Sequence, residues 1–261
     1  AGDVNGDGFD DFDLVDLTGN HYVVYGKAGL TSVEVSSMSV AGNTNGYVFN
    51  TTAYYNGPAG DINGDGLNDV VMQNTTNTAY VVLGNTRSPG AMTTTTTGFT
   101  VSNGFTITSP TTAISGISVV GDVNGDGYDD VLINFNAAPN SAFLLYGSSS
   151  NANVTLPTGS TGTFANGYFI NNGVTSVASG GVLVSASGDF NGDGYSDFIQ
   201  MNNAANAAGT AYVHFGGSAL TGITTNTMSV AGTGRGFAIN GLVGTTVYTT
   251  AGGDKIGRAS C

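Results

Sequence analysis

Short apolar segments separated by polar, glycine-rich turns extend along the whole chain, and none has the length or spacing of an amphipathic helix. Four of them directly follow a stretch rich in Asp, Asn and Gly: Phe12–Val15, Val70–Met72, Val131–Ile133 and Phe198–Met201. Their β-branched and aromatic residues are typical of strands. The pattern therefore predicts four strands in equivalent positions along the chain.

Further strands follow each of these in the same order. A second, ending in glycine, is predicted at Tyr22–Gly26, Tyr80–Gly84, Phe143–Gly147 and Tyr212–Gly216. A third, beginning with glycine and an aromatic residue, is predicted at Gly46–Phe49, Gly104–Ile107, Gly167–Ile170 and Gly236–Ile239. A fourth, such as Ile117–Val120 or Val182–Ser185, leads into the next Asp-rich stretch.

Repeating units of about four strands are the pattern of β-propeller blades. The sequence thus predicts an all-β fold, a four-bladed β-propeller forming a single domain over residues 1–261. The repeat units span approximately 1–60, 61–121, 122–188 and 189–261.

The Asp-rich stretches are four copies of a nine-residue motif: Asp3–Asp11, Asp61–Asp69, Asp122–Asp130 and Asp189–Asp197. In each copy positions 1, 3, 5 and 9 are Asp, Asn, Asp and Asp, and position 6 is Gly. Oxygen-bearing side chains at alternate positions of a tight loop converge on one point, and the glycine allows a left-handed backbone turn. This all-oxygen donor set suits Ca²⁺ better than Mg²⁺.

The motif differs from an EF-hand, which needs a bidentate acid at position 12 followed by a helix. Position 12 is here Leu14, Met72, Ile133 or Gln200, and strands follow. The acid at position 9 is therefore expected to close the cage, with the backbone carbonyl at position 7 as an additional ligand. Asn-Gly and Asp-Gly pairs also mark hairpin turns, but four copies with the same acids at the same offsets favour a metal site.

The loop, the YVVYG-type strand and the Gly-Phe-x-Ile strand together resemble the FG-GAP repeat, the unit of the integrin α-subunit β-propeller, over essentially the whole chain. The resemblance implies one structural Ca²⁺ per loop, held at positions 1, 3, 5, 7 and 9. The implied metal ligands are Asp3, Asn5, Asp7, Phe9 and Asp11; Asp61, Asn63, Asp65, Leu67 and Asp69; Asp122, Asn124, Asp126, Tyr128 and Asp130; and Asp189, Asn191, Asp193, Tyr195 and Asp197. The integrin propeller has seven blades, whereas this chain has four units.

The ends of the chain are out of phase with the units. The chain begins inside the first loop, and its Gly236–Thr250 segment leads into a degenerate fifth loop at Asp254–Arg258. We expect the C-terminal strands to complete the blade that begins at Ala1, closing the ring within one chain. The alternative is head-to-tail strand addition between copies of the chain.

Charge is concentrated in the loops. The formal net charge is −13, and 14 of the 18 acidic residues lie in the four motifs. Four bound Ca²⁺ would leave a net charge of about −5, so the acidity is metal-binding in character and argues against nucleic acid as a partner. No apolar run is long enough to predict a membrane span. The absence of a signal peptide before the first loop fits a matured secreted chain or an excised fragment.

Catalytic chemistry has no clear source in this sequence. His21 and His214 lie in or beside second strands without acidic or cysteine neighbours at ligand spacing, so both are interpreted as surface or strand positions. Cys261, the only cysteine, cannot form an internal disulfide. We therefore expect no enzyme. The predicted function is an extracellular or cell-surface, calcium-stabilised structural or adhesive module, such as a subunit of a surface fibre or matrix. The alternative is a lectin-like or integrin-like propeller that binds a glycan or protein ligand.

Overall fold

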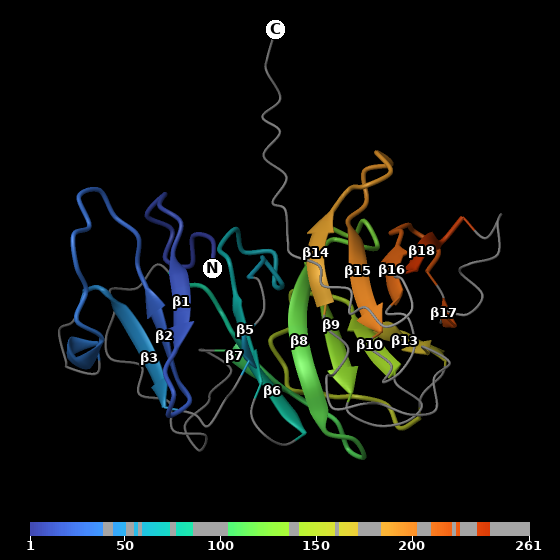
Figure 1. Cartoon of the computed structure of the whole chain (residues 1–261), viewed down its shortest axis with the longest axis horizontal. Coiled ribbons are helices and arrows are strands. Elements are labelled where there is room, and N and C mark those ends of the chain that lie inside the picture. The colour runs from blue at the N-terminus through green and yellow to red at the C-terminus, as the bar shows by residue number, and fades with distance from the viewer. Residues whose placement is uncertain are drawn as a thin grey trace, which may run out of the picture. The chain divides into compact units, whose positions relative to one another are not determined.

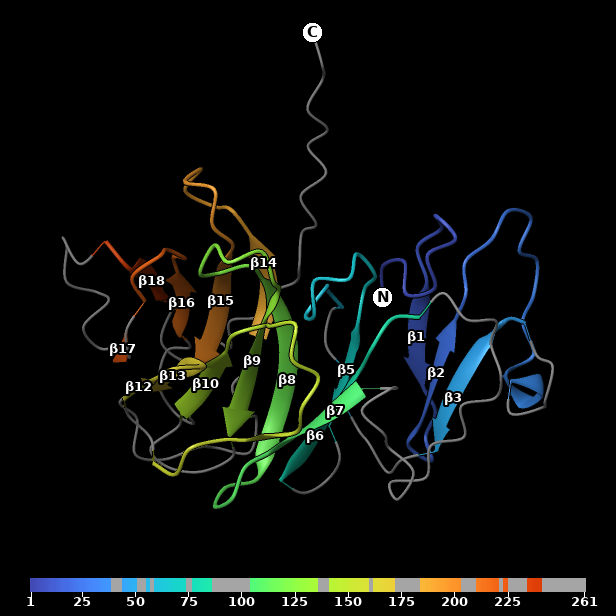
Figure 2. The ribbon, with the colours of Figure 1, turned by 180° about the vertical axis from the view of Figure 1, so that it is seen from behind.

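The computed structural model describes residues 1–38, 44–50, 55–56, 59–73, 77–85, 104–135, 141–159, 162–171, 184–202, 210–220, 223–224 and 234–240. Within these residues the fold is all-β, with 18 strands in four sheets and a single 3₁₀ turn, η1 (Val35–Ser37). The strands are shown from two sides in Figures 1 and 2. The predicted all-β class is confirmed. No helix in the described residues is long and apolar enough to cross a membrane.

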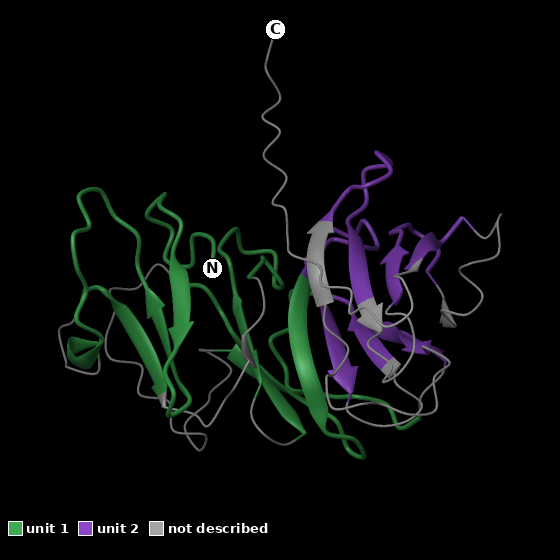
Figure 3. Cartoon of the chain, viewed as in Figure 1, with its two compact units in different colours: residues 1–119, 147–159 green, residues 120–146, 160–261 purple. Residues whose placement is uncertain are grey.

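The chain divides into two compact units (Figure 3). Unit 1 comprises residues 1–119 and 147–159, and unit 2 comprises residues 120–146 and 160–261. Strand β8 (Ile114–Gly121) begins in the first unit and ends in the second. That the whole chain forms a single propeller domain stays a prediction.

Unit 1 contains the first two sheets. The first has the order β1-β2-β3, with β1 (Phe12–Val15), β2 (Asn20–Val24) and β3 (Gly46–Asn50) antiparallel. The second has the order β11-β7-β6-β5-β4. Its strands are β4 (Tyr55–Asn56), β5 (Val70–Gln73), β6 (Thr78–Val82), β7 (Gly104–Thr108) and β11 (Val154–Thr155). Strand β11 joins β7 in parallel, and the other pairings are antiparallel.

Unit 2 contains the other two sheets. In the third, the order is β12-β13-β10-β9-β8, and β17 pairs in parallel with β13. In the fourth, the order is β14-β15-β16-β18. The strands not yet bounded are β9 (Asp130–Phe135), β10 (Ser141–Leu145), β12 (Thr163–Phe164), β13 (Gly167–Asn171), β14 (Val184–Gly188), β15 (Asp197–Asn202), β16 (Thr210–His214), β17 (Ile223–Thr224) and β18 (Gly236–Asn240).

The strand positions predicted from the sequence are confirmed to within a few residues. The four sequence repeats also share one strand register. The residue after each ninth-position Asp lies opposite the residue two before the glycine of the second strand: Phe12 opposite Val24, Val70 opposite Val82, Val131 opposite Leu145 and Phe198 opposite His214. The glycine that opens each third strand pairs with that same residue. The sequence repeat is therefore a structural repeat.

A close backbone approach explains the glycine at the start of the third strand. At Gly46 and Gly167 an added Cβ would collide with the carbonyl oxygens of Val23 and Leu144 on the neighbouring strand. Their φ angles of 140° and 152° are also unfavourable for residues with a side chain. The Gly-aromatic pattern thus records a steric requirement of this strand pair.

Neighbouring sheets within each unit pack in the same way. We call the side chains of the second and third strands that point to the next sheet the forward face; in the first sheet they are Val23, Tyr25, Tyr47 and Phe49. We call the side chains of the first and second strands that point to the previous sheet the rear face; in the second sheet they are Val70, Met72, Tyr80 and Val82. These eight residues form one buried cluster in unit 1.

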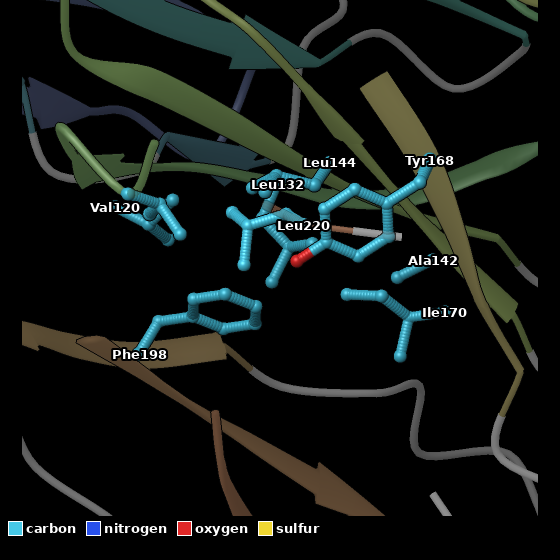
Figure 4. Packing of buried hydrophobic residues seen from close by; sticks show 9 residues of the cluster. Val120, Leu132, Ala142, Leu144, Tyr168, Ile170, Phe198 and Leu220 are labelled. Carbon is cyan, nitrogen blue, oxygen red and sulfur yellow. The ribbon is translucent and has the colours of Figure 1, made fainter. Parts of the chain in front are cut away.

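The same contact recurs in unit 2 (Figure 4). The forward face of the third sheet, formed by Leu144, Tyr146, Tyr168 and Ile170, packs with Phe198 and Tyr212 from the rear face of the fourth. In Figure 4 the ring of Phe198 lies across from Tyr168 and Ile170. The core of each unit is therefore a sandwich of one forward and one rear face.

The C-terminal segment differs in part from the prediction. Strand β18 pairs with β16 in the fourth sheet, so Gly236–Asn240 does not complete the sheet that begins at Ala1. Its Gly-Phe-Ala-Ile sequence has the pattern of a third strand, and it takes the third-strand place in its own sheet. Residues 241–261, with the rest of the expected closing segment and Cys261, lie outside the described residues.

Candidate metal centre

The Asp at position 1 organises each acidic loop through backbone hydrogen bonds. Its Oδ1 accepts from the N–H of position 4 at 2.6–2.7 Å and from that of position 5 at 3.0–3.2 Å. Its Oδ2 accepts from the N–H of position 6 at 2.8–2.9 Å. Since all four loops make these bonds, the four motifs adopt one conformation.

Two glycines per loop make this conformation possible. At position 6, Gly8, Gly66, Gly127 and Gly194 have φ between 86° and 92°. At position 4, Gly6, Gly64, Gly125 and Gly192 have φ between 74° and 79°. Both sets lie in the left-handed region that other residues rarely adopt. Sequence reasoning identified the role of position 6 but missed position 4, although its glycine is also present in all four copies.

Positions 3 and 5 are joined to each other and to the turn. The Asn at position 3 accepts from the N–H of position 5 at 2.9–3.1 Å, and its Nδ2 donates to Oδ2 of the Asp there at 2.8–3.1 Å. Oδ1 of that Asp accepts from the N–H of position 7 at 3.0–3.1 Å. The oxygens of positions 1, 3 and 5 are thus held within one tight turn.

The Asp at position 9 is the buried member of the set. Asp11, Asp69, Asp130 and Asp197 are all buried. Oδ2 accepts from the N–H of position 2 at 2.7–3.0 Å in every loop. In the first, second and fourth repeats, Oδ1 accepts from the N–H of the glycine that ends the second strand, at 2.8–2.9 Å; these glycines are Gly26, Gly84 and Gly216. This carboxylate therefore ties the loop to a strand about 15 to 19 residues further along.

The electrostatic environments of the first and ninth positions are opposite. The hydrogen bond from the Gly194 N–H, with those from Gly192 and Asp193, lowers the pKa of the Asp189 carboxyl. Burial raises the pKa of Asp69 to about 7, and the nearby negative charges of Asp65 and Asp61 act in the same direction. Burial also raises the pKa of Asp11 and Asp197. In the first, second and fourth loops the ninth-position carboxylate is therefore held where burial disfavours its charged form.

Neighbouring loops within a unit are hydrogen-bonded to each other. In unit 1 the carbonyl of Asp3 accepts from the Asn68 N–H at 2.9 Å, and that of Val4 accepts from the Asn85 N–H at 2.7 Å. In unit 2 the carbonyl of Asp122 accepts from the Ser196 N–H at 2.9 Å, and that of Val123 accepts from the Gly217 N–H at 2.8 Å. The conformation of one loop is thus coupled to the next sheet.

The donor set fits a hard divalent cation. Every predicted side-chain ligand is a carboxylate or amide oxygen, and a carboxylate has about four lone-pair positions, more than the backbone bonds occupy. In the described part of the chain no three carboxylate, imidazole or thiolate groups gather closely enough to form a ready-made metal site. Positions 1, 3 and 5 share one turn, whereas both oxygens of the ninth-position Asp accept backbone N–H bonds where the structure describes them. The twenty implied ligands stay predictions.

The two histidines are strand residues, as predicted, but neither is on the surface. His21 in β2 and His214 in β16 are both fully buried. The ring of His214 stacks on Phe198 with centroids 4.6 Å apart, and its Nε2 lies 3.2 Å from Oε1 of Gln200. Burial, with the positive charge of Arg235, lowers the pKa of His214 to about 3. It is a neutral core residue of the rear face.

The fold and the loops together define a class: repeated, mainly antiparallel sheets, each with an oxygen-rich loop, in which the first three loops are hydrogen-bonded to the next repeat. Residues 61–133, from the second loop to β9, match the family model of the FG-GAP-like repeat. This match supports the resemblance to FG-GAP repeats and lies on the segment that contains the second and third loops. No curated protein matches the chain.

Proposed function

We propose that this protein is a calcium-stabilised structural or adhesive module of an extracellular or cell-surface assembly, with its four sheets as propeller blades and one Ca²⁺ in each acidic loop. The observation that carries the proposal is the hydrogen-bonded loop that recurs four times with the same oxygen donors. A cation there would compensate the clustered carboxylates, and the ninth-position Asp would transmit its binding to the second strand.

The structural role is supported by where the loops lie in the sequence and the fold. The second, third and fourth loops each join two neighbouring strands of one sheet, namely β4–β5, β8–β9 and β14–β15. In the first three loops the carbonyl of position 2 accepts a backbone N–H bond from the next repeat, and in the first and third the carbonyl of position 1 does so too. A metal at such a place stiffens the contact between sheets. Calcium is plentiful outside cells, where weak calcium sites are filled. A rigid module of this kind suits a surface fibre or matrix.

Calcium stoichiometry tests the metal part of the proposal. The purified protein, dialysed against millimolar CaCl₂, is expected to contain about four Ca²⁺ per chain above the calcium content of the dialysis buffer by elemental analysis. Asp126→Asn, which removes the charge at position 5 of the third loop, is expected to lower the count by about one. Asp13→Asn, outside the motifs, is the matched control. A wild-type protein that takes up no Ca²⁺ in a millimolar titration contradicts the proposal.

The structural role has a test of its own. We expect limited proteolysis to be at least about tenfold slower in millimolar calcium than in EGTA, because cleavage proceeds through locally or globally opened states that the ion disfavours. Equal cleavage rates in the two buffers would contradict a stabilising role, even if the protein binds the ion.

A further inference from the structure

Two of the described sheet faces expose apolar side chains whose counterparts in other sheets are buried. On the rear face of the first sheet, Phe12 and Leu14 are 42% and 37% exposed, whereas the equivalent Val70 and Met72 of the second sheet are at most 1% exposed. On the forward face of the fourth sheet, Phe237 and Ile239 are each 46% exposed. Their equivalents in the first and third sheets are at most 6% exposed.

These two exposed pairs correspond to the two sides of the contact that is buried between the first and second sheets. In unit 1 the forward positions Tyr47 and Phe49 pack on the rear positions Val70 and Met72. By register, Phe237 and Ile239 are the equivalents of Tyr47 and Phe49. Phe12 and Leu14 are the equivalents of Val70 and Met72. Unit 1 therefore has an uncovered rear face on its first sheet, and unit 2 has an uncovered forward face on its fourth sheet, each with the residue types that the buried contacts use.

The exposed forward face already has the geometry of the buried ones. Phe215 and Phe237 meet edge to face with centroids 5.9 Å apart. The equivalent pairs Tyr25–Tyr47 and Tyr146–Tyr168 meet edge to face at 6.0 and 6.3 Å. An exposed aromatic pair held in the arrangement of a packed one is ready to receive a rear face without rearrangement.

The acidic loop of the fourth sheet also exposes an apolar side chain that is buried in the other loops. Phe190, at position 2 of the fourth loop, is 47% exposed, whereas Val4, Ile62 and Val123 at position 2 of the other loops are at most 2% exposed. In the other three loops the carbonyl of position 2 accepts a backbone N–H bond from the next repeat, at 2.7–3.0 Å. No such bond to the carbonyls of Asp189 and Phe190 is found in the described residues.

We propose that the forward face of the fourth sheet in one copy, with Phe190, Phe237 and Ile239, binds the rear face of the first sheet, with Phe12 and Leu14, in a second copy. The occupant is a second copy because a single chain carries both halves of the contact. The halves differ, so the association is heterologous and head-to-tail, and it extends to a closed ring or an open filament. The inference rests on the structural role proposed above and names its partner.

Two complementary variants test this contact. Phe12→Asp with Leu14→Asp disables the rear face, and Phe237→Asp with Ile239→Asp disables the forward face. In analytical ultracentrifugation with calcium and a reducing agent, the wild type is expected as two or more copies. Each variant alone is expected as a monomer, with its self-association weakened at least tenfold.

Mixing the two variants in equal amounts gives the decisive result. Each retains the half that the other has lost, so the mixture is expected to form a dimer and nothing larger. Leu17→Asp, which puts the same charge on a fully exposed apolar residue of the β1–β2 turn, is the control and is expected to assemble like the wild type.

Several outcomes overturn the proposal. A monomeric wild type would do so and would indicate that the two faces are covered within one chain. A mixture that stays monomeric, or a Leu17→Asp protein that also dissociates, would contradict the assigned faces. Calcium content is measured on the same samples. A monomeric wild type with four bound ions would overturn the contact and leave the calcium proposal intact. An assembled wild type that contains no bound calcium would overturn only the calcium proposal.

Discussion

The ninth-position Asp is the buried carboxylate of each acidic loop. It is buried, and where both oxygens are described they accept backbone N–H bonds from two segments that are far apart in sequence. A buried carboxylate near other carboxylates is unfavourable unless a positive charge compensates it. We therefore expect this carboxylate to stabilise the fold only when calcium is bound.

Replacing this carboxylate by an amide tests that dependence. Asp69→Asn keeps the size of the side chain but removes the charge beside Asp61 and Asp65. We expect the calcium affinity of the second loop to fall by at least about tenfold, since ligand charge sets the affinity of such sites. The chelated protein loses like-charge repulsion, so the gap between the melting temperatures in calcium and in EGTA should narrow.

The control for this variant is Asp10→Asn, which removes an exposed charge at position 8 of the first loop. Its gap between the two melting temperatures should equal that of the wild type. If Asp69→Asn also leaves the gap unchanged, the ninth position does not contribute to metal binding.

His214 predicts a pH dependence of stability. Its pKa is about 3 in the folded protein, because of burial and then of the Arg235 charge, and about 6.5 in an unfolded chain. The unfolded chain thus binds more protons between these values, and the free energy of unfolding falls as the pH is lowered through this window. From pH 7 to pH 5 the contribution of this one residue is a loss of about 2 kcal/mol.

His214→Leu isolates that contribution, because the equivalent residues of the other three sheets are Val24, Val82 and Leu145. Urea denaturation at pH 7 and pH 5 should show a smaller decrease for the variant than for the wild type. Parallel decreases in the two proteins would mean that His214 is protonated in the folded state at these pH values.

At the scale of elements, the glycine after the second strand links strand, loop and neighbouring sheet. The N–H of Gly84 donates to Asp69 at 2.9 Å. A Cβ there would lie 2.6 Å from Cβ of Leu67, 2.7 Å from the carbonyl oxygen of Asn68 and 3.1 Å from that of Val4. The strand can approach the two loops this closely only without a side chain.

Gly84→Ala should therefore be costly although it adds a single methyl group. Two of the three clashes are with backbone atoms, which cannot move aside as a flexible side chain can, so we expect a loss of about 1–3 kcal/mol in the free energy of unfolding. Gly188→Ala is the matched control, since its Cβ would come no closer than 3.4 Å to the Phe190 ring. Equal stability of the two variants in urea denaturation would contradict the close approach.

At the scale of the whole molecule, charge is the dominant feature. The net charge is −13, and most of the acidic residues belong to four loops in which carboxylates lie close together. Such clusters repel when no cation is present, so folding should be coupled to metal binding. A protein with four sites gains stability from each occupied site.

Chelation is therefore expected to lower the melting temperature by tens of degrees, on the order of several kcal/mol in stability. Thermal melts followed by circular dichroism in millimolar CaCl₂ and in excess EGTA provide the measurement. Added MgCl₂ serves as the control and should restore little, because Mg²⁺ demands near-ideal octahedral geometry and keeps several waters rather than binding in a cage made entirely of protein oxygens. An unchanged melt in EGTA is the contrary result.

Much of the local structure was predictable from the sequence. Strands such as β1 and β10 and the left-handed glycines follow from short-range sterics and apolar patterning, which act within a few residues and leave their mark on residue type. The four-fold repetition reinforced each assignment. For the same reason the turn formed by positions 1 to 6 was recognisable, since its hydrogen bonds close within the motif.

Burial and long-range bonding were decided by the tertiary structure alone. Phe12 and Val70 occupy the same place in the repeat and are both apolar, yet one is exposed and the other is buried, because only the second has a neighbouring sheet against it. The two histidines are buried, and the ninth-position Asp reaches a glycine on another strand, through contacts between segments distant in sequence. Residue type records what a position tolerates locally, whereas its exposure and partners depend on which sheets come together.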